Sequence, residues 1–147
     1  MDEVIQRFNK SVIRYLLIGG QAVRLEGLPR FSMDWDSYIP PRDLDNIRKI
    51  NELLAGDIDV ALEPLGPKGE NFVQTYQTRW GILQFHLGGH GLPPFDDAEK
   101  AAVQRATEIG TLVRCLNPRQ LLESKRRSGR PQDQSDILFL EEKLGLC

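Results

Sequence analysis

Apolar and polar residues follow one another along this chain with periods that change between about 3.6 and 2 residues. Apolar side chains recur at helical spacing over residues 3–14 and again over residues 44–54, which predicts an amphipathic helix in each segment. Residues 15–18, between them, are continuously apolar and predict a strand buried on both faces. The first third of the chain therefore combines helices with at least one central strand.

Turn residues and changes of period divide the rest of the chain. In the middle of the chain, the pattern predicts a short helix over 20–27, a strand over 31–39, a loop over 57–69 with a short apolar piece at 58–62, and a hairpin of 72–78 with 81–87. A loop over 88–94, a helix over 96–107 and a strand over 111–116 are predicted next. The chain then continues with a helix from Pro118 to about 127, capped by Asn117, and a last helix over 131–144. This order predicts an α/β or α+β fold, with helices flanking a small mixed sheet and a helical C-terminus.

Composition narrows the class of protein. The 147 residues are 40% hydrophobic and 27% charged, which fits one domain over residues 1–147 with a real core. We expect no membrane segment, because no apolar run approaches bilayer length. Cys115 and Cys147 are the only cysteines, so we expect a reducing, cytoplasmic setting without a disulfide framework. A net charge of −2 argues against a protein that coats nucleic acid by bulk electrostatics.

Two glycines and two acids carry the strongest chemical signal. Gly19 and Gly20 follow the buried strand, and Asp34 and Asp36 lie two apart on the next one. Residues two apart point to the same face of a strand, so the two carboxylates should repel each other unless a cation lies between them. Mg²⁺ often uses one or two carboxylates together with substrate phosphates, which glycine backbone can approach closely. A tight turn and a solvated strand edge are the purely structural interpretations.

This order of motifs resembles the nucleotidyltransferase superfamily of the polymerase-β type. The family combines a Gly-Gly or Gly-Ser turn with a pair of acids on the next strand about a dozen residues later, and here Gly20 and Asp34 are fourteen positions apart. The segment from Leu17 to Pro40 is most similar to small prokaryotic members of toxin–antitoxin and abortive-infection systems. The resemblance also implies that Arg30, shortly before the acids, belongs to the nucleotide site.

A second segment, Lys125 to Asp136, combines basic and acidic residues around a Gly-Pro break. A solvated basic turn beside acids at a helix start is one interpretation. The spacing of Lys125, Arg130, Asp133 and Asp136 also resembles the C-terminal motif of the abortive-infection type nucleotidyltransferases. The resemblance implies that Lys125 and Arg130 meet a polyphosphate, with Asp133 as a supporting catalytic acid. The basic residues here are also candidates for contact with RNA.

One position departs from the family pattern. Members of the superfamily usually carry a third acid on a later central strand, where this chain has Gln84. Glutamine cannot serve as a general base, so three alternatives stay open. Asp133 or Asp136 supplies the missing acid, metal ions lower the pKa of the attacking hydroxyl without a base, or the protein binds without chemistry. His86 and His90 have zinc-like spacing, but two histidines alone predict metal binding weakly, and a substrate contact of His86 is the other interpretation.

These observations lead to three hypotheses. The first is a Mg²⁺- or Mn²⁺-dependent transfer of a nucleotide from an NTP to RNA, protein or a small molecule, with Asp34 and Asp36 as metal ligands. The second is a weakened member acting as a binding module, such as an antitoxin or regulatory partner. The third treats the acids as surface charge.

Overall fold

The chain forms one six-stranded sheet in the computed structural model, which describes residues 1–89 and 91–146. The strands lie in the order β3-β4-β2-β1-β6-β5. Their bounds are Leu16–Ile18 (β1), Asp34–Tyr38 (β2), Val73–Thr78 (β3), Gly81–His86 (β4), Val103–Ala106 (β5) and Leu112–Cys115 (β6). The pairs β2–β4 and β1–β6 are parallel, and the other three pairs are antiparallel. The sheet is therefore mixed, and the predicted fold class and the predicted hairpin are both confirmed.

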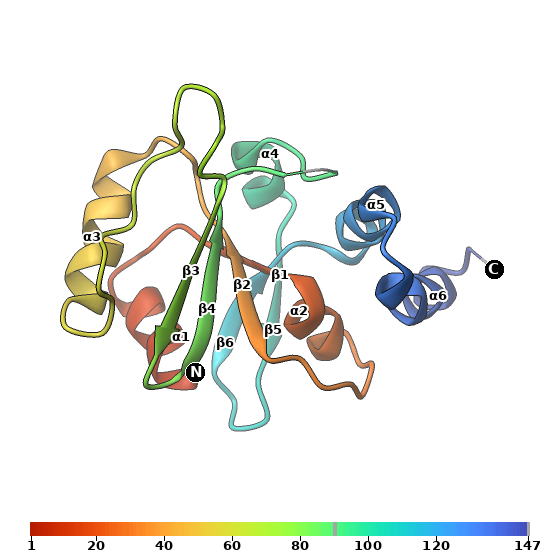
Figure 1. Ribbon diagram of the computed structural model, residues 1–147. Helices are drawn as coiled ribbons and strands as arrows, with labels where there is room; N and C mark the ends of the chain where they lie inside the picture. Colours follow the sequence, from red (N-terminus) through yellow and green to blue (C-terminus); the bar gives the residue numbers. More distant parts are fainter. Residues whose placement is uncertain (90, 147) are drawn as a thin grey trace.

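The helices lie on both sides of this sheet (Figure 1). Their bounds are Asp2–Lys10 (α1), Gly19–Leu25 (α2), Leu44–Leu54 (α3), Phe95–Lys100 (α4), Pro118–Ser128 (α5) and Gln134–Lys143 (α6), with a 3₁₀ turn, η1, at Pro131–Asp133. In Figure 1, α1 and α3 lie on one side of the sheet, whereas α2, α5 and α6 lie on the other. The predicted N-cap of α5 is confirmed, because the Asn117 side chain accepts a hydrogen bond from the Gln120 amide.

The two faces of the central strands have different chemistry. Phe85 of β4 is fully buried and packs against Phe8 of α1, with ring centroids 6.4 Å apart. Residues directly paired across β2 and β4 share a face, so Asp36 lies beside Gln84 on the face opposite to Phe85. Apolar packing with α1 therefore fixes one face of the sheet, and polar side chains of β2 and β4 are presented on the other.

The prediction of one helix over residues 96–107 is wrong. Helix α4 ends at Lys100, and β5 then pairs with β6 from Val103 opposite Cys115 to Ala106 opposite Leu112. Local preference favours a helix in this alanine-rich segment. In the structure, however, residues 103–106 extend the sheet, and their side chains alternate between partly buried and exposed. Long-range pairing therefore overrides the local preference here.

Several predicted bounds are too wide. The predicted strand 31–39 is ordered as a strand only from Asp34 to Tyr38, and the last predicted helix begins with the 3₁₀ turn before α6. The first helix stops at Lys10, where a Schellman-type end follows: Ile13 N bonds to Phe8 O and Val12 N to Asn9 O.

Val12 takes the left-handed conformation at this helix end, with φ of 56°, although a β-branched residue disfavours it. Since its side chain is exposed, little packing is lost on removal. We expect Val12→Gly to raise the free energy of unfolding by about 1 kcal/mol, since relief of strain exceeds the entropy cost of glycine. Urea unfolding measures this, with Val60→Gly as the control: Val60 is also exposed but has no positive φ. Equal effects at both positions would contradict strain at Val12.

Two positions that drew attention in the sequence, His90 and Cys147, lie outside the described residues. Within the ranges 1–89 and 91–146, no helix combines the length and the apolar character needed to cross a bilayer.

Candidate functional site

The Gly-Gly turn brings the backbone against one of the two acids. Ile18, the last residue of β1, pairs with Asp36, so Gly19 starts α2 directly beside that carboxylate. Gly19 has φ of +70°, and a Cβ atom added to it would overlap Asp36 Oδ2. Any side chain at this position would therefore displace the carboxylate as well as strain the backbone.

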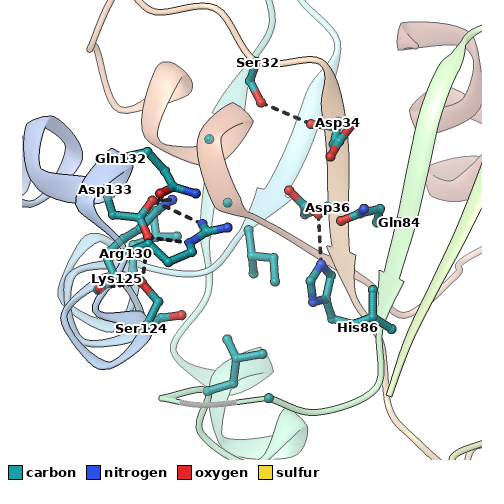
Figure 2. Close-up of a pocket in the computed structure, with 18 of the residues that line it drawn as sticks. Ser32, Asp34, Asp36, Gln84, His86, Ser124, Lys125, Arg130, Gln132 and Asp133 are labelled. Carbon is teal, nitrogen blue, oxygen red and sulfur yellow. Dashed lines mark hydrogen bonds and ion pairs between the residues drawn. The ribbon is translucent and has the colours of Figure 1, made fainter. Parts of the chain in front are cut away.

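Four polar side chains form a wall on the sheet, which we call the acidic wall: Asp34 and Asp36 from β2, and Gln84 and His86 from β4 (Figure 2). Asp36 pairs directly with Gln84 in the parallel ladder. His86 Nε2 lies 2.9 Å from Asp36 Oδ1, and because an ionised carboxylate only accepts hydrogen bonds, this nitrogen donates. The Asp36 carboxylate is thus oriented between His86 and Gly19.

A second wall, the basic wall, consists of Lys125 and Ser128 from α5 with Arg130 and Asp133 around η1. Lys125 Nζ lies 3.0 Å from Asp133 Oδ1, and Arg130 Nε lies 2.9 Å from Asp133 Oδ2. Ser128 Oγ donates to the same carboxylate. Burial by itself raises the pKa of Asp133, but the hydrogen bonds from Arg130, Ser128 and Lys125 outweigh it and lower the pKa to about 2.

The two cations of this wall differ in exposure. The side chain of Lys125 is only 8% exposed and also contacts Asp136 Oδ2 at 3.1 Å. The side chain of Arg130 is 56% exposed. A buried ammonium between two carboxylates is well compensated, whereas the guanidinium of Arg130 keeps donors available to a ligand.

Arg30 lies beside the start of α2 and contacts the C-terminal motif. It forms an ion pair with Asp136, whose side chain is buried, and a Cβ atom on Gly20 would lie 3.0 Å from Arg30 Cζ. The second glycine therefore allows Arg30 to pass close to the backbone of α2. The acids of the C-terminal motif thus hold cations from two distant parts of the chain.

The walls face each other across a cleft of about 870 Å³ (Figure 2). All eight residues that the sequence predicted for the site line it: Gly19, Gly20, Arg30, Asp34, Asp36, Lys125, Arg130 and Asp133. The structure therefore brings together two motifs that are about 90 residues apart in sequence.

Asp133 is not grouped with the two acids of β2. In the described part of the chain, no three histidine, cysteine or acidic side chains are placed so that they could hold a metal ion together. Asp133 and Asp136 are instead engaged by cations of the basic wall. The idea that either residue replaces the missing third acid has no support in this arrangement.

The basic stretch offers less free charge than its sequence suggests. Arg126 pairs with Glu141, and Arg127 pairs with Glu123. Together with the contacts of Lys125 and Arg130, every cation of this stretch has an acidic partner. A solvated or structural role therefore explains the stretch better than a broad RNA-binding surface.

Sequence reasoning did not assign the contact between His86 and Asp36, nor the apolar residues Phe31, Met33 and Phe72 that line the cleft. The strand period contained a signal for His86, because it lies two residues after Gln84 and so shares its face. Phe31 and Met33 carried no such signal, since they precede the ordered strand.

Comparison with solved protein structures agrees with this geometry at the level of the fold. The structure is similar to the crystal structure of a provisionally assigned nucleotidyltransferase from Thermotoga maritima, with a TM-score of 0.57 over 96% of this chain and 89% of that one. The two sequences are only 8% identical, so the likeness shows the fold alone. No protein-family model and no curated protein matches the chain. The chain therefore has a nucleotidyltransferase-like fold.

Proposed function

We propose that this protein binds a nucleoside triphosphate in the cleft between the two walls and transfers its nucleotidyl group to a hydroxyl acceptor. The observation that carries the proposal is the opposition of Asp34 and Asp36 to Arg130 across one cleft, at the Gly-Gly turn. The fold similarity supports the same class of protein. An RNA end, a protein side chain or a small molecule each offers a suitable hydroxyl.

The donor set of the acidic wall fits a divalent cation. Asp34 and Asp36 supply hard oxygen ligands on one strand face, and Mg²⁺ or Mn²⁺ is commonly bound by one or two carboxylates with the remaining positions taken by phosphates and water. When bound, such an ion neutralises phosphate charge and lowers the pKa of a nearby hydroxyl. His86 orients Asp36 for this task through its hydrogen bond.

The basic wall has a complementary task. Arg130 offers guanidinium donors to the outer phosphates, and Lys125 holds Asp133, the partner of Arg130, in place from a buried position. In the transfer, an acceptor oxygen forms a bond to the α-phosphorus while the bond to the β-phosphate oxygen breaks. Pyrophosphate leaves, its charge is stabilised by this wall, and the acceptor proton passes to solvent.

Binding of each of the four NTPs, with and without Mg²⁺ or Mn²⁺, tests this proposal by calorimetry. We expect metal-dependent binding of at least one NTP, followed by transfer of label from an α-labelled nucleotide to an acceptor. Absence of binding of all four NTPs would contradict the proposal.

Gln84 favours a second candidate, a binding module without turnover, such as the regulatory or antitoxin partner of another protein. Its neutral amide lies beside Asp36, where a carboxylate would be needed for base catalysis.

If the fold lacks only this group, Gln84→Asp should increase nucleotidyl transfer at least about 100-fold, the usual contribution of a general base. The matched control is Gln77→Asp, because Gln77 is an exposed residue of β3 that does not line the cleft. Intact NTP binding with no gain in turnover would favour the binding module.

The close approach of Gly19 to Asp36 gives a further prediction. Gly19→Ala should destabilise the fold by about 1 kcal/mol through backbone strain and also weaken metal-dependent NTP binding at least about tenfold, because the methyl group displaces the carboxylate. Gly110→Ala is the matched control: Gly110 has φ of +89° but no atom within 4 Å of the added Cβ. Urea unfolding and calorimetry separate the effects. Equal NTP affinities of the two variants would show that Gly19 acts only on the backbone.

A further inference from the structure

The lining of the cleft includes exposed apolar side chains that the proposed phosphate chemistry does not use. Phe31 is 81% exposed and Met33 is 64% exposed, and both line the cleft beside Asp34. We call these two side chains the apolar lip. Covering exposed apolar side chains of this size lowers the free energy, so their position at the cleft indicates a ligand that packs against them.

The backbone under the lip is held in place. The Ser32 carbonyl accepts a hydrogen bond from Gln21 Nε2 at 2.7 Å, and the Phe31 carbonyl accepts one from Arg30 Nε at 3.3 Å. Arg30 is itself anchored by Asp136. The two apolar side chains therefore project from a fixed segment between α2 and β2, which makes them a preorganised surface.

The cleft is thus divided into a charged part and an apolar part. Asp34, Asp36 and Arg130 can engage a metal-bound triphosphate, whereas the lip has neither strong donors nor acceptors. A nucleoside triphosphate has the same division, because its base is the part with a flat apolar face. Bases stack on aromatic side chains without regard to sequence, and thioethers also contact aromatic rings favourably.

We propose that Phe31 and Met33 form the nucleobase subsite of the cleft, with Phe31 stacking on the base. This inference rests on the proposed NTP binding. Since the lip offers no hydrogen-bonding pattern to read, the subsite accepts any base and favours purines modestly through their larger face.

The test compares a ligand that has a base with one that lacks it. ATP and inorganic tripolyphosphate are titrated, each with Mg²⁺, into the wild type and into Phe31→Ala. We expect Phe31→Ala to weaken ATP binding about tenfold, as loss of one stacking contact does, while tripolyphosphate binding changes less than about twofold. Phe31→Trp should retain ATP affinity. Val60→Ala, an exposed apolar residue outside the cleft, is the control.

A fluorescent readout gives an independent check. The emission of 2-aminopurine riboside triphosphate is quenched on stacking, so its bound form should be dimmer with the wild type than with Phe31→Ala. Unchanged ATP affinity in Phe31→Ala with equal quenching would overturn the subsite while leaving the proposed function intact. A wild type that binds neither tripolyphosphate nor any of the four NTPs would overturn the proposed function itself, and the subsite with it.

Discussion

Replacing both acids of β2, as Asp34→Asn/Asp36→Asn, is expected to abolish metal-dependent NTP binding, with affinity falling at least about 100-fold, or ~2.7 kcal/mol. The amides keep the size of the side chains but remove the negative charge that a divalent cation requires. The metal-free fold should not become less stable, because two neighbouring acids on one strand face repel each other. Calorimetry with the tightest-binding NTP, with and without Mg²⁺, measures the loss.

The chain supplies a matched control for this experiment. Asp57 and Asp59 have the same two-residue spacing, but neither lines the cleft, and Asp57 pairs with Arg79. Asp57→Asn/Asp59→Asn should therefore leave NTP affinity unchanged. A thermal shift of the wild type with Mg²⁺ and NTP, absent from the β2 variant, supports the same site, since only a ligand that prefers the folded state raises stability. If both double variants bind as the wild type does, the acids of β2 are surface charge and no metal site exists there.

The second large effect concerns stability. Lys125→Met is expected to lower the free energy of unfolding by about 3 kcal/mol. The variant keeps most of the length of the side chain but leaves Asp133 and Asp136 buried with one cation fewer, and removing one partner of a buried ion pair is costly. Urea unfolding at constant m measures the change.

Arg126→Met on the same helix is the control for this variant. Arg126 pairs with Glu141 at the surface, and such pairs contribute less than about 1 kcal/mol. Similar losses in both variants would show that the network of Lys125 is no stronger than a surface pair. A large loss of stability only in Lys125→Met would identify Lys125 as a structural support of the basic wall. Any fall in the NTP affinity of Lys125→Met must then be compared with the fall caused by replacing Arg130, whose side chain is exposed.

Experiments can separate the contribution of the apolar lip to ligand binding from the contribution of the two walls. Variants of Asp34 and Asp36 should affect every ligand that carries phosphates, whereas variants of Phe31 should affect only ligands that carry a base. The fold similarity by itself does not predict this difference, because at 8% identity it shows only a similar arrangement of helices and strands.

Local patterns were sufficient for most of the fold. The period of residues 44–54 identified α3, and Asn117 with Pro118 identified the start of α5, because both signals depend on side chains within one or two turns. Strand β5 was missed for the opposite reason. Residues 103–106 become a strand only by pairing with β6, and that partner lies across a turn that local preference does not describe.

The sequence alone determined which side chains share a strand face and that a Gly-Gly turn precedes an acid pair, since both follow from backbone geometry over a few residues. Only the tertiary structure decided that the C-terminal motif faces those acids, that Asp133 and Asp136 hold cations instead of joining the acids, and that Phe31 and Met33 stay exposed at the cleft. Contacts of this kind join residues tens of positions apart. They depend on how helices pack against the sheet, which no local period specifies.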